Sequence, residues 1–332
     1  MEENAVERPP RESSLTVAED VFGLVGGTPL VRVDVPEANP GVDVYAKLEG
    51  VNPSGSVKDR IARRMLERAE ATGALTPEKT IVEPTSGNTG IAVAAAAAAK
   101  GYDARIVMSG NMSRERVCIL KALGADVVIT PPEAGEDGAM EEARRLAAND
   151  PDGYWMPDQF SNEENVRAHY ETTGPEIFEA TDGEVTHFVA GMGTAGTVVG
   201  VGRYLKERDP SITVSAVHPV RADEIQGLKN VYRTETPGNF DEEVPDEVVD
   251  VDVEDANEWA RRLTRETGLF VGQSSGATMH RAARVAAEID EGLVVPMFAD
   301  MGFKYLTTDP YADEEIDAKV EECRDREVTV EL

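Results

Sequence analysis

The sequence is poor in cysteine, in histidine and in long apolar segments. Its 332 residues include two cysteines, Cys118 and Cys323, which lie far apart in the chain. They argue against a disulfide framework and fit a reducing cytoplasm. The four histidines have no metal-ligand spacing, so no metal site is predicted. The longest apolar run, Ile91 to Ala99, is far shorter than the roughly 20 residues of a membrane-spanning helix.

Basic residues are also scarce, and lysine above all. Asp and Glu number 63 against 33 Lys and Arg, which gives a net charge of −30, and only nine residues are lysine. Nucleic acids and anionic membranes bind clustered Lys and Arg, so the charge argues against both as partners. An acidic excess with little lysine is typical of proteins from a high-salt cytoplasm, with an ordinary acidic surface as the alternative. We favour the halophilic interpretation, because the acidic residues are spread along the whole chain.

The length of the chain corresponds to roughly two domains of about 150 residues, and a hydrophobic fraction of 41% is enough for a packed core. Strand-like and helix-like segments alternate, which indicates βαβ units, parallel sheets and the α/β class. We expect helices at 57–73, 88–101, 113–124 and up to 208. We expect strands at 80–84, 104–109, 126–130, 186–191 and 211–219.

The two ends and one acidic stretch are expected to lie outside the core. Residues 1–15 are polar, predict a mobile tail and show no signal-peptide pattern. The acidic C-terminus from Asp309 predicts a short helix and a strand. The stretch 242–258 is rich in Asp and Glu and predicts solvated surface.

Three glycine-rich turns follow strand-like segments, at 83–90 (EPTSGNTG), 190–197 (AGMGTAGT) and 271–278 (VGQSSGAT). The first two aim backbone N–H groups and hydroxyls at the start of a helix, which is a natural carboxylate or phosphate site. The alternative for each is a simple tight turn. Two anion sites indicate a ligand with two anionic ends, or a cofactor beside a substrate. The turn at 190–197 also matches G-x-G-x-x-G, but no acidic residue ends the next strand, which disfavours NAD.

Lys58, in the segment NPSGSVKDR, stands just inside the start of a helix that Ser56 could cap. The positive end of a helix disfavours a cation. A solvent-facing lysine tolerated at some cost is one interpretation. We favour the other, a lysine in a cleft that forms a Schiff base and acts as nucleophile and base.

These motifs together resemble one family. The sequence is similar to the pyridoxal-phosphate β-replacement enzymes of fold type II, which comprise cysteine synthases with cystathionine β-synthase as a near relative. The similarity extends from about Val21 to Thr308. It is carried by the motifs VGGTPLV, KLEGVNPSGSVKDR, IVEPTSGNTGIA, DQFSN with HYETTGPEI, GMGTAGT and GQSSGAT, in this order.

The resemblance implies two domains, each with a mostly parallel sheet flanked by helices, and an active site in the cleft between them. The larger, cofactor-phosphate domain would comprise 16–47 and 161–308, and the smaller, mobile domain 48–160. Residues 1–15 would form the tail and 309–332 an acidic extension. The family also implies a homodimer.

The resemblance further implies pyridoxal 5′-phosphate as cofactor and the synthesis of L-cysteine. An O-acetylserine or O-phosphoserine substrate would react through an α-aminoacrylate with sulfide, or with sulfur delivered by a carrier protein. Lys58 resembles the Schiff-base lysine, Asn88 the partner of the phenolic oxygen and Ser274 the partner of the pyridine nitrogen. The phosphate loop would comprise Gly193, Thr194, Ala195, Gly196 and Thr197. The substrate carboxylate would be bound by Thr85, Ser86, Thr89 and Gln159.

Several positions depart from the family pattern. Gly27 stands where the family usually has Asn, and Ala195 stands where it has Gly. The exchange at Ala195 is mild if the φ of this residue is negative. The ending GFKYLTT is closer to the O-phosphoserine-using sulfhydrylases. Those relatives carry an arginine in the loop after the strand that ends near His218. Arg221 stands in this loop, one position from the expected place. We therefore predict Arg221 as a phosphate-binding residue, with a surface arginine as the equal alternative, and the leaving group stays open between acetate and phosphate.

Other functions of the same fold compete with this interpretation. A serine or threonine deaminase, or a threonine synthase, would not usually carry the KLEGVNPSGSVKDR form around its lysine. Cystathionine β-synthase activity stays open, although the haem-binding extension and the regulatory modules of the long enzymes do not occur in the sequence. A scaffold protein without chemistry is disfavoured, because Lys58, Asn88 and Ser274 are all present.

Overall fold

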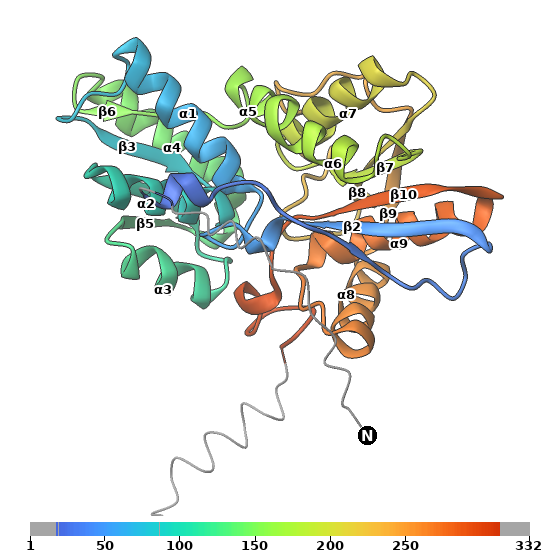
Figure 1. Ribbon diagram of the computed structural model, residues 1–332. Coiled ribbons are helices and arrows are strands. Elements are labelled where there is room, and N and C mark those ends of the chain that lie inside the picture. The colour runs from blue at the N-terminus through green and yellow to red at the C-terminus, as the bar shows by residue number, and fades with distance from the viewer. Residues whose placement is uncertain (1–17, 19, 86, 313–332) are drawn as a thin grey trace, which may run out of the picture.

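The computed structural model describes residues 18, 20–85 and 87–312 of the chain (Figure 1). The predicted tail at 1–15 lies outside these residues, and so do Ser86 and the helix and strand predicted after Asp309, apart from 309–312. Two separate sheets organise the described part. Figure 1 shows the smaller sheet with α1 to α4 on one side of the molecule and the larger sheet with α6 to α9 on the other.

The larger sheet has six strands in the order β1-β2-β10-β7-β8-β9. All neighbours are parallel except β1 and β2, which pair antiparallel at one edge. Its core strand β7 reads HFVAG, a short apolar run typical of a strand buried on both faces. The strands are β1 (Leu30–Arg32), β2 (Gly41–Leu48), β7 (His187–Gly191), β8 (Thr213–Pro219), β9 (Glu247–Val251) and β10 (Glu291–Phe298).

The smaller sheet has four strands in the order β5-β4-β3-β6, and every pair is parallel. These strands are β3 (Thr80–Pro84), β4 (Ala104–Ser109), β5 (Asp126–Thr130) and β6 (Tyr154–Trp155). Together with the larger sheet they confirm the predicted α/β class with mostly parallel sheets.

Helices cover both faces of each sheet, because side chains of successive strand residues point to opposite faces. Ile81 packs in the core formed with α1, α2 and α3, while its neighbour Val82 packs against α4. In the larger sheet, Val189 faces α8 and α9, and Phe188 faces α6 and α7. The helices are α1 (Lys58–Thr72), α2 (Asn88–Lys100), α3 (Arg114–Ala122), α4 (Gly135–Asn149), α5 (Glu163–Ala168), α6 (Gly174–Ala180), α7 (Gly196–Arg208), α8 (Val253–Thr267) and α9 (Gln273–Glu288).

The predicted segments agree with these bounds to within a few residues. Glycines end two of them as expected, since Gly73 and Gly101 adopt the left-handed conformation that closes α1 and α2. The expectation for 242–258 was too simple: the stretch contains β9 and the start of α8, and Val251 is buried. Val248 and Asp250 are exposed, whereas Glu247 and Val249 are half-buried beside the buried Val251, so acidic residues stand on both faces and the strand shows no clean polar alternation. No helix in the described ranges is long and apolar enough to cross a membrane.

A buried ion cluster joins α1 to the larger sheet. The Arg60 guanidinium donates to the Glu49 carboxylate at 2.7 and 2.8 Å and to the Glu176 carboxylate at 2.7 Å. Lys47 donates to Glu176 at 2.7 Å as well. Burial alone would raise the pKa of Glu176, but the bonds from Arg60 and Lys47 outweigh it and lower that pKa to about 2. Glu176 therefore stays ionised, and the cluster fixes α1, which carries Lys58 at its start.

Candidate active site

One cavity forms where the carboxyl ends of strands from both sheets meet, the usual ligand position in α/β folds. It is enclosed by the turns that follow β3, β7 and β10, together with the starts of α1 and α9. Most of the predicted site residues share this cavity. Its lining includes Lys58, Asn88, Thr89, Gly193, Thr194, Ala195, Thr197 and Ser274.

Lys58 is the first residue of α1 and presents its amine to the cavity. The predicted cap is present in a weak form, because the N-cap residue is Val57 and the Ser56 hydroxyl accepts from the Lys58 N–H at 3.3 Å. Burial lowers the pKa of Lys58 to about 8, although the carboxylates of Asp300 and Glu136 act in the opposite direction. The neutral amine, which is the form that attacks a carbonyl, is thus more populated near neutral pH than in an ordinary lysine.

The turn from Gly193 to Thr197 opens α7, a helix whose first N–H groups have no intrahelical partner. A Cβ at position 193 would lie 2.7 Å from the backbone oxygen of Gly227, so only glycine allows the two loops to approach this closely. The Thr194 hydroxyl accepts from Asn165 at 2.9 Å, which leaves its hydrogen free to donate. The Thr197 hydroxyl lies 3.2 Å from the ring nitrogen Nε2 of His169, whose pKa burial holds well below its usual value.

Ala195 adopts a φ of +65°, in the left-handed region that favours glycine. The condition for a mild exchange, a negative φ, is therefore not met. The side chain is buried and packs against Val166, Met192 and Val199, so apolar contacts offset part of the backbone strain. Gly27 also has a positive φ, +58°, which glycine and asparagine adopt more readily than other residues.

The turn after β3 brings the predicted carboxylate-binding residues together, except Ser86, which lies outside the described residues. The Thr89 hydroxyl donates to Gln159 Oε1 at 2.5 Å, and the Thr85 hydroxyl accepts from the Gly87 N–H at 3.0 Å. Glu83 accepts from the backbone N–H of Gln159 at 3.4 Å and thereby holds that segment. Burial raises the pKa of Glu83 to about 8.

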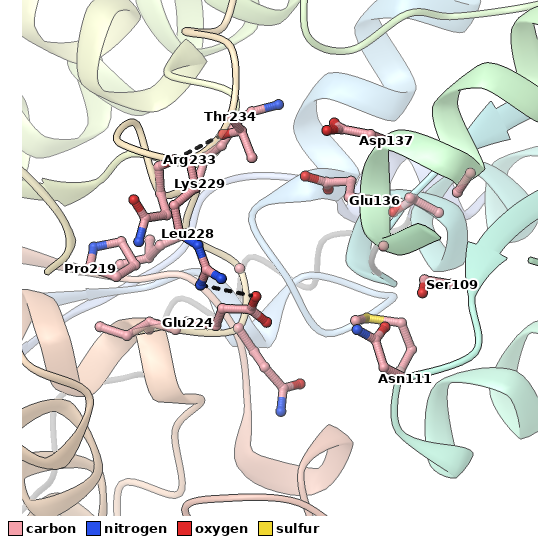
Figure 2. A pocket seen from close by; sticks show the side chains of 18 of the residues that line it. Ser109, Asn111, Glu136, Asp137, Pro219, Glu224, Leu228, Lys229, Arg233 and Thr234 are labelled. Carbon is pink, nitrogen blue, oxygen red and sulfur yellow. Dashed lines mark hydrogen bonds and ion pairs between the residues drawn. The ribbon is translucent and has the colours of Figure 1, made fainter. Parts of the chain in front are cut away.

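A wider cleft of about 310 Å³ adjoins this cavity (Figure 2). Figure 2 shows Lys229 and Arg233 on one wall and Glu136 and Asp137 on the other. Arg233 is paired with Glu224 at 3.6 Å, whereas Lys229 is 7% exposed and lies over the Phe160 ring. Lys229, Glu136 and Lys58 also share a small connecting cavity, so the cleft leads to the lysine amine.

Arg221 is a predicted site residue that the structure brings neither to the cavity nor to the cleft. Its side chain is exposed, its guanidinium lies 5.3 Å from the centre of the Tyr232 ring, and it lines neither the cleft nor the cavity described above. A shift of one position in an irregular loop changes the direction of a side chain, which is why the sequence could not place it.

Sequence reasoning missed several charged residues of the site. Arg116, Lys229 and Glu136 line the cleft, and Asp300 and Lys304 contact Asn88. One signal was available for the last two, because a lysine and an aspartate in ADMGFKYLTT directly follow a strongly apolar strand. Nothing in the local sequence identifies the others.

The cavity fits pyridoxal phosphate. It combines a lysine amine of lowered pKa with a glycine-lined helix start where the Thr194 hydroxyl is free to donate to a phosphate. These features define a class of protein, one that holds a phosphorylated aldehyde against a lysine. The chain belongs to the pyridoxal-phosphate dependent enzymes, since the profile of that family matches residues 21–300.

Within this family the chain is similar to proteins named cysteine synthase. It is 44% identical to the cysteine synthase of Aquifex aeolicus, over 90% of this chain and 93% of the relative. It is 41% identical to cysteine synthase B of Escherichia coli, over 87% and 95% of the two chains. The crystal structure of a cysteine synthase from Entamoeba histolytica superposes with a TM-score of 0.85 at 35% identity, over 94% and 95% of the chains. An O-acetylserine dependent cystathionine beta-synthase from Helicobacter pylori reaches 0.83 at 34% identity, over 90% and 100% of the chains.

Proposed function

We propose that this enzyme is a cysteine synthase that makes L-cysteine from an O-activated serine and sulfide. The observation that carries the proposal is the convergence of Lys58, Asn88, Ser274 and the Gly193–Thr197 turn on one cavity. Relatives named cysteine synthase, at 40 to 44% identity over most of both chains, support it.

In this proposal each residue binds one part of the cofactor or substrate. Lys58 would hold the aldehyde carbon, and the turn from Gly193 to Thr197 would hold the phosphate through N–H groups and hydroxyls. Ser274 would meet the ring nitrogen and Asn88 the ring oxygen. The α-carboxylate of the substrate would be bound by Thr85, Ser86, Thr89 and Gln159.

The residues of this chain would then move the α-proton of the substrate and direct the replacement of its β-substituent by sulfide. When bound, the cofactor would supply an electron sink that makes the α-proton of the substrate acidic. The substrate amine would replace Lys58 on the aldehyde carbon, and the freed Lys58 amine would take that proton. The β C–O bond would then break, and the leaving group would depart with the electron pair. Sulfide forms the new β C–S bond, and Lys58 returns the proton to the α-carbon. The neutral hydroxyl of Ser274 does not hold the ring nitrogen protonated as an aspartate would, which favours prompt loss of the leaving group.

The choice of serine donor tests this function directly. We expect purified protein to form cysteine from O-acetylserine and sulfide in a parallel assay with O-phosphoserine and with serine plus homocysteine. The acidic wall of Glu136 and Asp137 disfavours a phosphate dianion, which acetate as leaving group avoids. Absence of cysteine with both activated serines would contradict the proposal. Formation of cystathionine in the third mixture would then assign cystathionine β-synthase activity instead.

O-phosphoserine is the second candidate donor, because Lys229 is a buried cation on the path to Lys58. If it is used, Lys229→Met should lower kcat/KM for O-phosphoserine by roughly tenfold and barely change the value for O-acetylserine. Arg221→Ala, the matched control, should change neither value. A selective loss in Arg221→Ala instead would assign phosphate binding to that residue, as the sequence predicts.

Replacement of Thr197 tests the proposed phosphate loop. We expect Thr197→Ala to weaken cofactor binding, because one charge-assisted hydrogen bond contributes about 1.5–3 kcal/mol. The measurement is a titration of cofactor-free protein with pyridoxal phosphate, with Thr72→Ala on the exposed side of α1 as control. Unchanged affinity in both Thr197→Ala and Thr194→Ala would show that the phosphate binds elsewhere.

The cellular setting and assembly belong to the same proposal. A net charge of −30 supports a halophilic enzyme that acts in a cytoplasm of high salt, and the family resemblance supports a homodimer.

We take 48–160 as the smaller, mobile domain and 16–47 with 161–308 as the larger one, because the four-stranded sheet lies wholly within the former range. Sulfide is the favoured sulfur donor, with a sulfur-carrier protein as the alternative.

A further inference from the structure

A lysine is buried directly behind the cavity. Lys304 ends a short 3-10 turn after β10 and is 4% exposed. Its ammonium donates to Asn88 Oδ1 at 2.8 Å and to the backbone oxygen of Gly55 at 3.1 Å. Removing an ammonium from water is costly unless it is hydrogen-bonded, and burial accordingly lowers the pKa of Lys304. The bond to Asn88 is therefore one of two that compensate for the burial of this charge.

The other end of the Asn88 amide has an equally definite partner. Asn88 Nδ2 donates to Asp300 Oδ2 at 2.7 Å. Asp300 is 1% exposed, and the same oxygen accepts from the Tyr305 hydroxyl at 2.8 Å. The carboxylate is thus held in place by a residue that does not reach the cavity lining described above.

These two partners allow only one orientation of the amide. An ammonium can only donate, so it requires the Asn88 oxygen, and an ionised carboxylate can only accept, so it requires the nitrogen. Asp300 uses one of the two Nδ2 hydrogens, and among the described residues the other has no acceptor within hydrogen-bond reach. Asn88 lines the cavity together with Lys58 and Ser274.

We propose that Lys304 and Asp300 are positioning residues that hold the Asn88 amide with its second N–H directed to an acceptor oxygen on the cofactor ring. The inference rests on the proposed function and deepens it. The ammonium on Oδ1 also polarises the amide, which makes the remaining N–H a stronger donor. Without Lys304, the amide loses the partner that specifies its oxygen.

The contacts also connect the two sheets at this point. Asn88 begins α2 beside the smaller sheet, whereas Lys304 and Asp300 follow β10 of the larger one. The Ser113 hydroxyl donates to the backbone oxygen of Lys304 at 2.9 Å, so this backbone is held from the other side as well. A purely structural role for Lys304 would affect stability alone, and a positioning role would also change the bound cofactor.

The test compares Lys304→Met with Lys304→Arg in protein loaded with pyridoxal phosphate. We expect Lys304→Met to shift the visible absorbance maximum of the bound cofactor and to weaken its binding by roughly tenfold, as the loss of one hydrogen bond would. Lys304→Arg keeps a donor-only cation and should restore both values to near wild type. Lys121→Met, an exposed lysine on α3, is the matched control and should change neither.

A second variant keeps the test independent of the folding of the first. Asp300→Asn can donate as well as accept, so it no longer specifies the amide, and it should shift the absorbance in the same way. A wild-type absorbance maximum and cofactor affinity in both variants, with only the melting temperature lowered, would overturn the positioning role and leave the proposed function intact. Absence of any cofactor band in the wild-type protein would overturn both together.

Discussion

Lys58→Ala should abolish turnover and remove the covalent link between protein and cofactor. The lysine is the amine of lowered pKa in the cavity, and in the proposed function it serves both as the attachment point and as the base that moves the α-proton. We expect borohydride to fix pyridoxal phosphate on the peptide that contains residue 58 in the wild-type protein and on no peptide in the variant. General base catalysis alone contributes about 10²–10⁴-fold, so the loss of both roles should exceed that range.

Lys121→Ala is the control for this experiment, because that lysine is exposed on α3. It should retain full turnover and the reducible linkage. Circular dichroism of Lys58→Ala should match the wild type, since the cavity is open at this residue. Mapping of the cofactor to another lysine would contradict the assignment.

The second large effect is on stability. Arg60→Met should lower the free energy of unfolding by about 3–5 kcal/mol, because it leaves the Glu49 carboxylate buried without its cation. Urea denaturation followed by circular dichroism measures the change. Arg68→Met on the same helix is the matched control, since Arg68 is 59% exposed and its pairing at 3.7 Å should contribute less than about 1 kcal/mol. Equal losses in the two variants would show that the buried cluster does not stabilise the fold.

The sequence predicted the parts of the site that depend on local pattern. Thr85, Asn88 and Thr89 follow β3, and Gly193 to Thr197 follow β7, each group extending into the start of the next helix, so period, glycine spacing and hydroxyl content single them out as candidates. The first turn follows β3 of the smaller sheet and the second follows β7 of the larger sheet, so their meeting in one cavity depends on how the two sheets pack and not on local pattern.

The remaining parts depend on contacts between distant segments. Asn88 and Lys304 are separated by 216 positions, and no local pattern connects them. Arg221 and Lys229 both stand in the irregular segment after β8, where only the folded loop decides which one faces the cleft. Ala195 shows the same limit for the backbone, because packing against Val166 and Val199 supports a φ that the residue type disfavours.

The most direct test of the cysteine-forming function is the product that purified protein makes from O-acetylserine. With sulfide present, the account predicts stoichiometric L-cysteine and acetate, with little pyruvate, from protein that shows the visible band of bound pyridoxal phosphate. A deaminase of the same fold would release pyruvate and ammonia instead. Pyruvate as the main product in the presence of sulfide, or no turnover by cofactor-loaded protein, would contradict the account.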